Sequence, residues 1–173
     1  KRMDLLGRMD KRAQDATKWL EQNKSRFKHK IYFPIMTQIN VKTKEGVGLT
    51  ENSIPVRDLL AFVGEDLQDI KLFSSLLKKE LNISVNIVQA PNVQDYEITP
   101  TIPMSRLKAF GFTNFVVDLF DAPKPILRYL CKNHNLHNIP IGGQQINSSS
   151  VLESKLNINK FYCGNIMYQS SIS

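Results

Sequence analysis

The chain has 173 residues, of which 42% are hydrophobic, and it carries a formal net charge of +7 at pH 7. This composition supports one compact domain or two small lobes. No apolar run reaches the roughly 18 residues that span a bilayer, so we expect no membrane partner. Two cysteines are too few for a disulfide framework and indicate a reducing compartment.

The first thirty residues hold most of the excess charge, with ten Lys and Arg against four acids. They also predict one helix, whose apolar residues follow a spacing of three and four. These apolar residues are Leu6, Met9, Ala13, Ala16 and Leu20. The spacing is typical of a coiled-coil arm and equally of an amphipathic helix that docks on its own domain. Since the chain opens inside this pattern and lacks an initiator Met, we expect it to be a fragment.

Residues 31–100 predict a first lobe that contains a strand–helix–strand unit. Its elements are, in order, a strand over 35–42, a turn at Gly46 and Gly48, a strand over 59–63, a helix over 65–81 and a strand over 83–87. The apolar face of the helix is formed by Leu67, Ile70, Phe73, Leu77 and Leu81. The polar stretch from Asn92 to Pro103 then reads as a linker.

Residues 101–173 predict a second lobe that loosely repeats the first. Its elements are a helix over 105–109 ended by Gly111, a partly strand-like run over 115–120, a helix over 126–133, a strand over 139–141, a helix over 150–156 that Ser150 and Glu153 would cap, and strands over 160–163 and 166–172. The expected fold class is therefore α/β (mixed α+β), with two pseudo-repeated lobes, mixed sheets and packed helices.

Patterns that would support catalysis or metal binding are weak. Zinc-ligand residue types occur at Cys131, His134, His137 and Cys163. Their spacing matches no zinc class. The serines at 148–150 are better explained by helix capping, and Asp118 and Asp121 have no positioned base beside them. We expect no metal, no cofactor and no enzymatic activity.

Short motifs stand in a specific order from about Ala13 to Gly142. They are Trp19-Leu20, Asn23, Phe27-Lys28, Pro34-Ile35-Met36, Ile39-Asn40, Glu51-Asn52-x-Ile54-Pro55, Asp58-Leu59-x-Ala61-Phe62-Val63, Val85-Asn86, Ala90-Pro91, Leu107-Lys108, Gly111-Phe112, Leu119-Phe120-Asp121-Ala122-Pro123, Tyr129-Leu130-Cys131, His137 and Pro140-x-Gly142. This series resembles the hinge domain of the structural maintenance of chromosomes (SMC) family, in the form found in the fifth SMC subunit.

The resemblance implies a non-enzymatic dimerisation module at the far end of a long antiparallel coiled coil. Residues 1–30 would be the end of that arm, and the ATPase heads would lie elsewhere in the intact protein. The sequence indeed contains no Gly-x4-Gly-Lys-Ser/Thr phosphate loop. The implied partner is the hinge of the sixth SMC subunit, with room for further non-SMC subunits. The implied role is chromosome maintenance and DNA repair and recombination in the nucleus.

The base of the predicted arm is a candidate DNA-binding surface. Its cations are Lys18, Lys24, Arg26, Lys28 and Lys30, with His29 among them. Lys and Arg neutralise phosphates without reading sequence, and Phe27, Tyr32 and Phe33 could stack on unpaired bases. A solvated helix end beside core aromatics would explain the same residues without DNA. The resemblance favours DNA, single-stranded in preference.

Glycine-bearing segments of the second lobe are candidate partner contacts, because glycine allows another backbone to approach closely. The candidates, which the resemblance supports, are Ile139, Pro140, Ile141, Gly142, Gly143 and Tyr168. An ordinary turn explains Gly142-Gly143 equally well. A strand edge within 166–172 could also add to a partner's sheet. The alternative interpretation is a free-standing basic α/β domain that binds nucleic acid as a monomer.

Overall fold

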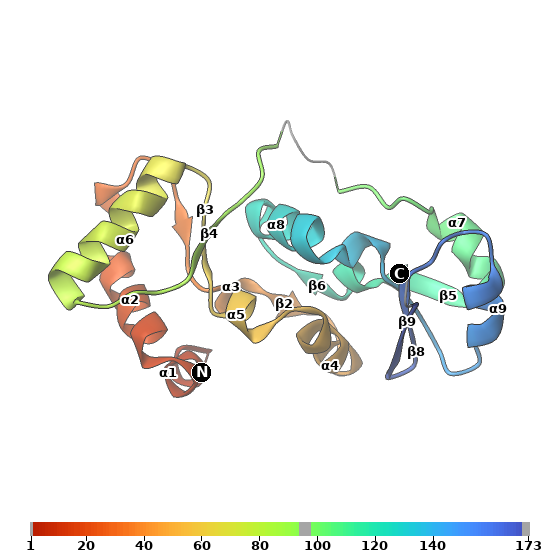
Figure 1. The fold of residues 1–173 in the computed structure, drawn as a ribbon. Coiled ribbons are helices and arrows are strands. Elements are labelled where there is room, and N and C mark those ends of the chain that lie inside the picture. Colours follow the sequence, from red (N-terminus) through yellow and green to blue (C-terminus); the bar gives the residue numbers. More distant parts are fainter. Residues whose placement is uncertain (1, 94–97, 171–173) are drawn as a thin grey trace. The chain divides into compact units, whose positions relative to one another are not determined.

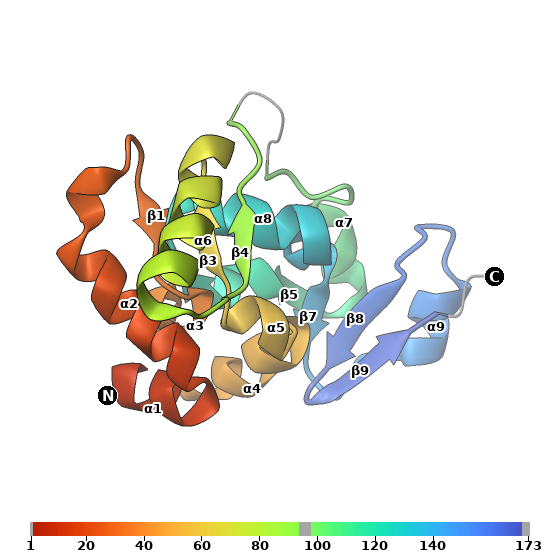
Figure 2. The same ribbon diagram turned by 60° about the vertical axis from the view of Figure 1, so that its left-hand side comes forward.

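The computed structural model describes residues 2–93 and 98–170, which form helices and short strands in two compact units (Figure 1, Figure 2). The first unit combines residues from the ranges 1–40, 54–97 and 122–132, and the second from 41–53, 98–121 and 133–173. Each half of the chain therefore gives one helix to the other unit: α4 (Lys44–Ser53) and most of α8 (Lys124–His134). The predicted lobes, 31–100 and 101–173, do not include this exchange.

The first unit is built on a three-stranded sheet in the order β1-β3-β4. Its strands are β1 (Ile31–Tyr32), β3 (Phe62–Gly64) and β4 (Ile87–Gln89). β1 is antiparallel to β3, and β3 is parallel to β4. The helix α6 (Leu67–Leu81) connects the parallel pair. The predicted strand–helix–strand unit is confirmed, with its last strand shifted toward the C-terminus.

The helix α6 follows its sequence signals closely. Asp66 caps its first turn by accepting a hydrogen bond from the N–H of Gln68 at 2.9 Å, and Asn82 ends it in the left-handed conformation (φ +55°). Its centre is buried, whereas Leu67 and Leu81 are 47% and 38% exposed. A 15-residue helix is about 22 Å long and three-residue strands only about 10 Å. The two ends therefore extend past the sheet.

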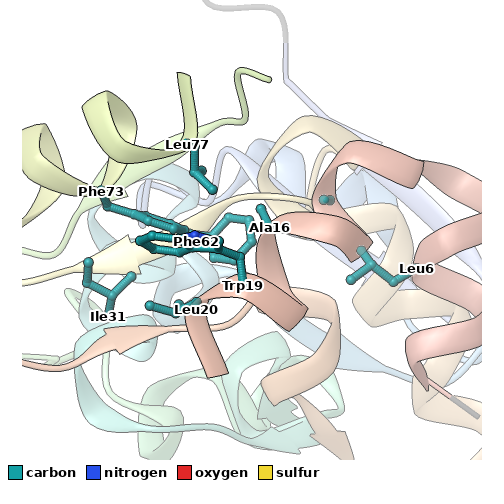
Figure 3. Close-up of a cluster of buried hydrophobic side chains, with 9 residues drawn as sticks. Leu6, Ala16, Trp19, Leu20, Ile31, Phe62, Phe73 and Leu77 are labelled. Carbon is teal, nitrogen blue, oxygen red and sulfur yellow. The ribbon is translucent and has the colours of Figure 1, made fainter. Parts of the chain in front are cut away.

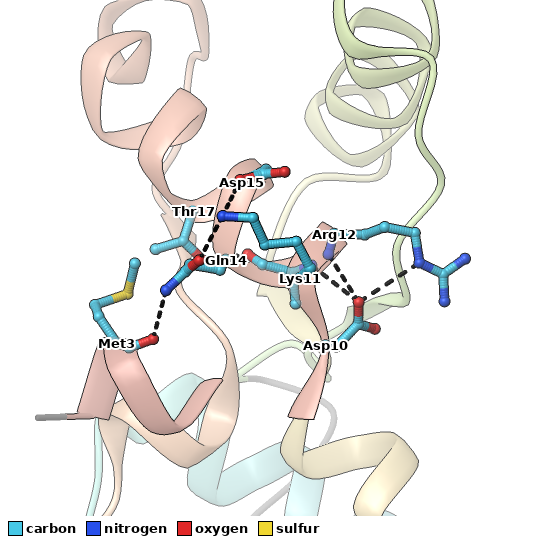
Figure 4. Close-up of polar contacts among 8 residues, drawn as sticks. Met3, Asp10, Lys11, Arg12, Gln14, Asp15 and Thr17 are labelled. Carbon is cyan, nitrogen blue, oxygen red and sulfur yellow. Dashed lines mark hydrogen bonds and ion pairs between the residues drawn. The ribbon is translucent and has the colours of Figure 1, made fainter. Parts of the chain in front are cut away.

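The predicted single N-terminal helix is wrong, because the chain turns at Asp10. That residue is extended (φ −156°) and separates α1 (Arg2–Met9) from α2 (Lys11–Gln22). Its carboxylate caps α2 by accepting from the N–H groups of Arg12 and Ala13 (Figure 4). The two helices then pack on each other, and Gln14 donates to the carbonyl of Met3 at 3.0 Å.

The apolar seam of these helices packs into the first unit's own core (Figure 3). The fully buried members are Leu6, Ala13, Ala16 and Leu20, whereas Met9 is 42% exposed. They contact a core that includes Ile31, Phe62, Phe73 and Leu77. Of the two interpretations left open by the sequence, the docked helix is the one observed for residues 2–22.

The segment after β1 also differs from its prediction. Residues 35–42 form α3 (Ile35–Gln38) and the short strand β2 (Asn40–Val41), which pairs with β6 (Phe120–Asp121). Ile35 and Ile39 are the buried residues, and a spacing of four fits a strand and a helix equally well. Gly46 and Gly48 lie inside α4 rather than in a turn. The helix α5 (Val56–Leu59) precedes β3.

The second unit contains a four-stranded sheet in the order β5-β7-β8-β9. Its strands are β5 (Phe112–Phe115), β7 (Pro140–Gly142), β8 (Lys160–Cys163) and β9 (Ile166–Gln169). β5 is antiparallel to β7, and β7 is parallel to β8 through the helix α9 (Ser148–Glu153). The antiparallel strand followed by a parallel pair repeats the first unit, so the mixed α/β pseudo-repeat is confirmed.

Short helical turns complete the structure. They are η1 (Lys24–Arg26), α7 (Met104–Leu107), η2 (Lys108–Phe110), η3 (Val116–Leu119) and η4 (Leu136–Asn138). Gly111 ends η2 with φ +100°, as the sequence predicts. The cap of α9 is Asn147 rather than Ser150. The end of the predicted last strand, 171–172, lies outside the described residues. Within residues 2–93 and 98–170 no helix is long and apolar enough to span a membrane.

Candidate functional site

The basic loop, residues 24–30, is held against the first turn of α6. Asp69 is 4% exposed, and its carboxylate accepts hydrogen bonds from the backbone N–H groups of Lys28 and His29 at 3.1 and 2.7 Å. The imidazole of His29 also lies 3.6 Å from the carboxylate of Asp66. Hydrogen bonds to a carboxylate are stronger than neutral ones. The backbone of the loop is therefore fixed, while the side chains of Lys28 and His29 remain exposed.

A cavity of about 490 Å³ opens beside the basic loop. It is lined by Leu20, Lys24, Phe27, Lys28, His29, Lys30, Ile31, Phe33 and Gln38. Among the described residues, no Asp or Glu belongs to this lining. Several cations around a partly apolar hollow raise the local positive potential, which attracts anions. We name this hollow the loop cavity.

The structure gathers three of the five predicted DNA-binding cations at the loop cavity: Lys24, Lys28 and Lys30. Lys18 instead lines a separate hollow of about 320 Å³. Arg26 forms an ion pair with Glu80 at 3.0 Å, and its guanidinium lies 5.6 Å from the ring centroid of Trp19.

Hydrogen bonds from Trp19 and Arg26 lower the pKa of Glu80. Arg26 is thus engaged within the first unit. The DNA role of all five cations stays a prediction.

Two aromatic residues, Tyr32 and Phe33, follow the basic loop. Ile31 and Phe33 line the loop cavity, and Tyr32 between them does not. The ammonium of Lys24 lies 5.3 Å from the ring centroid of Phe33, and that of Lys30 lies 4.8 Å from the ring centroid of Tyr32. Burial and the nearby charge of Glu65 raise the pKa of Tyr32. Phe33 and Phe27 are therefore the rings that a ligand in the cavity would meet.

Sequence reasoning missed two residues of this site, Asp69 and Gln38. Asp69 stands four residues before Phe73 in the helical pattern, so it falls on the buried face of α6. A charged residue on a buried helix face needs a hydrogen-bond partner, and this was a signal that could have been used. Gln38 carried no comparable signal, because its segment was predicted as a strand.

Most of the predicted partner contacts lie inside the second unit's own sheet. Ile139, Pro140 and Ile141 are buried, and β7 has a neighbouring strand on both sides. The carbonyl of Gly142 accepts from the N–H of Gly164 at 2.7 Å. A Cβ at position 142 would overlap Ile146 and lie 2.9 Å from the carbonyl oxygen of residue 111. Close packing within the chain thus explains this glycine.

The exposed apolar edge of the second unit is β9, the last strand of its sheet. Ile166 is 56% exposed and Met167 is 43% exposed. Tyr168 is half-buried and stacks on Phe161, with ring centroids 5.3 Å apart. An apolar edge strand has unpaired backbone groups that can pair with another chain. Of the predicted interface residues, only Gly143 and Tyr168 keep partly exposed surface.

Comparisons with known proteins identify the fold. No protein-family profile matches the chain. It is 32% identical over 167 residues to structural maintenance of chromosomes protein 5 of Caenorhabditis elegans. The aligned region covers 93% of this chain and 15% of that relative. The crystal structure of the S. pombe Smc5/6 hinge domain superposes with a TM-score of 0.81 at 18% identity, over 97% of this chain and 69% of that one. The chain has the fold of an SMC hinge domain.

A second hinge structure agrees. An asymmetric dimer of the Geobacillus stearothermophilus SMC hinge domain gives a TM-score of 0.58 at 12% identity, over 97% of this chain and 66% of that one. The resemblance predicted from the order of sequence motifs is therefore confirmed. The SMC hinge fold is not a catalytic fold. The chain spans only 15% of the length of its curated relative.

The remaining candidate residues have structural roles in this fold. Asp118 accepts the backbone N–H of Phe115 at 2.8 Å, and Asp121 lies 3.7 Å from the ammonium of Lys42. The serines at 148–150 form the start of α9. Burial raises the pKa of the Cys163 thiol and lowers the pKa of His137. In the part of the chain that the structure describes, no three His, Cys, Asp or Glu are grouped to hold a metal.

Proposed function

We propose that this chain is a hinge that pairs with the hinge of the sixth SMC subunit. The observation that carries the proposal is the likeness to the S. pombe Smc5/6 hinge over 97% of the chain, together with a relative that is an SMC protein 5. The edge position of β9 supports a mode of pairing, because Ile166 and Met167 offer exposed apolar surface on a strand to which a partner strand could be added. The edge of β9 is therefore our candidate partner contact.

A size measurement tests the pairing. The chain is mixed with the sixth-subunit hinge, and the mass of the complex is measured by light scattering during gel filtration. Ile166→Asp should weaken pairing about tenfold, because a charge replaces apolar contact. Val47→Asp is the matched control, since Val47 is an exposed apolar residue of the same unit but lies in α4.

Two results of that measurement would count against the proposal. If wild-type protein stays a monomer beside the sixth-subunit hinge, pairing is wrong and the free-standing nucleic-acid-binding domain becomes the better interpretation. If Ile166→Asp pairs as well as Val47→Asp, pairing stands but does not use the edge of β9.

We further propose that the basic loop binds DNA, with single strands preferred. The cluster of Lys24, Lys28 and His29 around one cavity supports this proposal, as does the concentration of positive charge in the first thirty residues. Phosphate contacts depend strongly on salt, since binding releases counterions. Raising salt from 50 to 200 mM should therefore weaken binding of a 20-nucleotide strand about tenfold.

Charge reversal tests which surface holds the DNA. The double variant Lys24→Glu with Lys28→Glu should weaken binding of a fluorescent 20-nucleotide strand by at least tenfold at 50 mM salt. The control, Lys78→Glu with Lys79→Glu, makes the same change of charge on exposed residues in the last turn of α6. Equal loss in both doubles would contradict a local site and indicate attraction by net charge alone.

The wider role follows from these two proposals. The paired hinges would join two arms in an SMC complex of the nucleus that acts in chromosome maintenance and DNA repair and recombination. ATPase heads and further non-SMC subunits would belong to the intact assembly. Residues 1–30 would link the hinge to its arm. Cross-linking in nuclei, followed by mass spectrometry of the intact complex, would test these assignments together.

A further inference from the structure

We propose that the loop cavity receives a single unpaired nucleotide, with its base on Phe33 and its phosphate at Lys24 and Lys28. This inference rests on the proposed DNA binding and adds the chemical unit that is recognised. A site for one unpaired nucleotide would explain why single strands are preferred. Bases in a duplex are paired and stacked on their neighbours, so none can enter a hollow without leaving the helix.

The size and lining of the loop cavity suit a nucleotide. About 490 Å³ lies within the range of ordinary small-molecule sites. Its lining combines the apolar and aromatic side chains of Leu20, Ile31, Phe27 and Phe33 with the cations Lys24, Lys28 and Lys30. Gln38 adds an amide, which can both donate and accept hydrogen bonds at the edge of a base. A nucleotide combines the matching features, a flat base that stacks on aromatic rings and an anionic phosphate.

The contact between Lys24 and Phe33 could be replaced by a contact between a base and Phe33 when a nucleotide binds. The Lys24 ammonium lies over the Phe33 ring, 5.3 Å from its centroid. A base on that ring stacks more favourably than an exposed ammonium does. The base would therefore displace the ammonium, and the flexible lysine could then meet the phosphate of the same nucleotide.

The walls of the cavity are already fixed before a ligand binds. Phe27 makes edge-to-face contacts with Trp19 and Phe73, at centroid distances of 6.3 and 5.8 Å. Asp69 holds the backbone of Lys28 and His29. Binding to a preorganised site loses less conformational entropy than binding that must first order a loop.

Removing bases from the ligand is the direct test. A 20-nucleotide thymidine strand and a 20-nucleotide abasic strand carry the same phosphates, and their Kd values are compared by anisotropy. Wild-type protein should bind the thymidine strand about tenfold more tightly. Phe33→Leu should remove that difference, while the matched Tyr32→Leu should keep it, because Tyr32 lies outside the cavity lining.

The outcomes distinguish a failure of the nucleotide site from a failure of DNA binding by the basic loop. Equal affinity of wild-type protein for both strands overturns the nucleotide site but leaves DNA binding intact. No binding of either strand overturns the DNA proposal itself. Thymidine monophosphate is the third ligand, and it should compete only at concentrations far above those of the strand. Competition at equal concentrations would overturn the proposal that the bound nucleotide belongs to a DNA strand, and would indicate a site for free nucleotides.

A measurement on unaltered protein guards against misfolded variants. A thymidine strand with one central 5-iodouracil is irradiated in the complex, and the modified peptide is identified by mass spectrometry. Cross-links should fall on Phe33 or Phe27. Cross-links confined to other segments would overturn the placement of the base.

Discussion

The two units share a topology but present different surfaces. In each, an antiparallel strand precedes a parallel pair that a helix connects. The first unit adds a basic loop and a cavity, whereas the second adds a fourth strand with an exposed apolar edge. The repeated sheet is thus a common scaffold, and the segments attached to it decide what each unit can bind.

The connecting helices explain part of this difference. The helix α6 has 15 residues, and its N-cap Asp66 and its first-turn residue Asp69 hold the basic loop. The helix α9 has only six residues and has no acidic residue in its first turn. A short crossover leaves the second unit without an equivalent support for a charged loop.

Truncating one buried ring in each unit should have the largest effect. Phe73→Ala and Phe161→Ala each remove a fully buried ring, so each should lower the free energy of unfolding by about 3–5 kcal/mol. Only Phe73→Ala should also weaken DNA binding, because Phe73 supports Phe27 at the cavity. Urea unfolding and anisotropy measure the two effects. Equal loss of DNA binding in both variants would contradict the division of roles.

Removing a loop-holding carboxylate should have the next largest effect. Asp69→Ala deprives two N–H groups of their acceptor and should cost about 3 kcal/mol, whereas Asp118→Ala deprives one and should cost about 1 kcal/mol. Hydrogen exchange should speed up at Lys28 and His29 in the first variant alone. Unchanged exchange there would show that Asp69 does not hold the basic loop.

Adding one methyl group compares the packing of the two sheets. Gly142→Ala should lower stability by about 2 kcal/mol, because the new Cβ meets the backbone carbonyl of residue 111. Gly64→Ala should cost about 1 kcal/mol, since its Cβ meets the side chain of Ile70, which can move. Thermal unfolding measures both. A larger loss at Gly64 would indicate that the first sheet is the more rigid.

The smallest effect is expected on the exposed surface of the first unit. Glu80 has a lowered pKa, so its ionised form stabilises the fold above its ordinary pKa of 4.5. This contribution is lost as the pH falls below 4.5 toward the lowered pKa. Glu80→Gln should therefore melt slightly below wild type at pH 7, and the difference should shrink as the pH falls below 4.5. A difference that stays constant as the pH falls would contradict an ionic contribution.

Local signals in the sequence were sufficient for several elements. The helices α6 and α8 and the strand β8 lie where periodicity and capping residues predict them, because each has a one-sided or alternating apolar pattern of its own. The order of motifs was sufficient to predict the SMC hinge fold. The cluster of cations around residues 24–30 was also visible, although their shared cavity was not.

Tertiary structure decided the rest. The turn at Asp10 buries Leu6 and Ala13 in the first unit, and a spacing of three and four cannot tell this from a coiled-coil seam. The exchange of α4 and α8 depends on the unit in which each helix packs, and an apolar helix face does not specify that unit.

The sequence by itself thus determined the type of fold and where positive charge concentrates. Folding decided that Asp69 holds the basic loop, that β7 is interior, and that β9 has the exposed edge. These features depend on contacts between residues far apart in the chain, such as the 41 positions between Lys28 and Asp69. Local patterns carry no information about such contacts, because many distant partners satisfy the same burial.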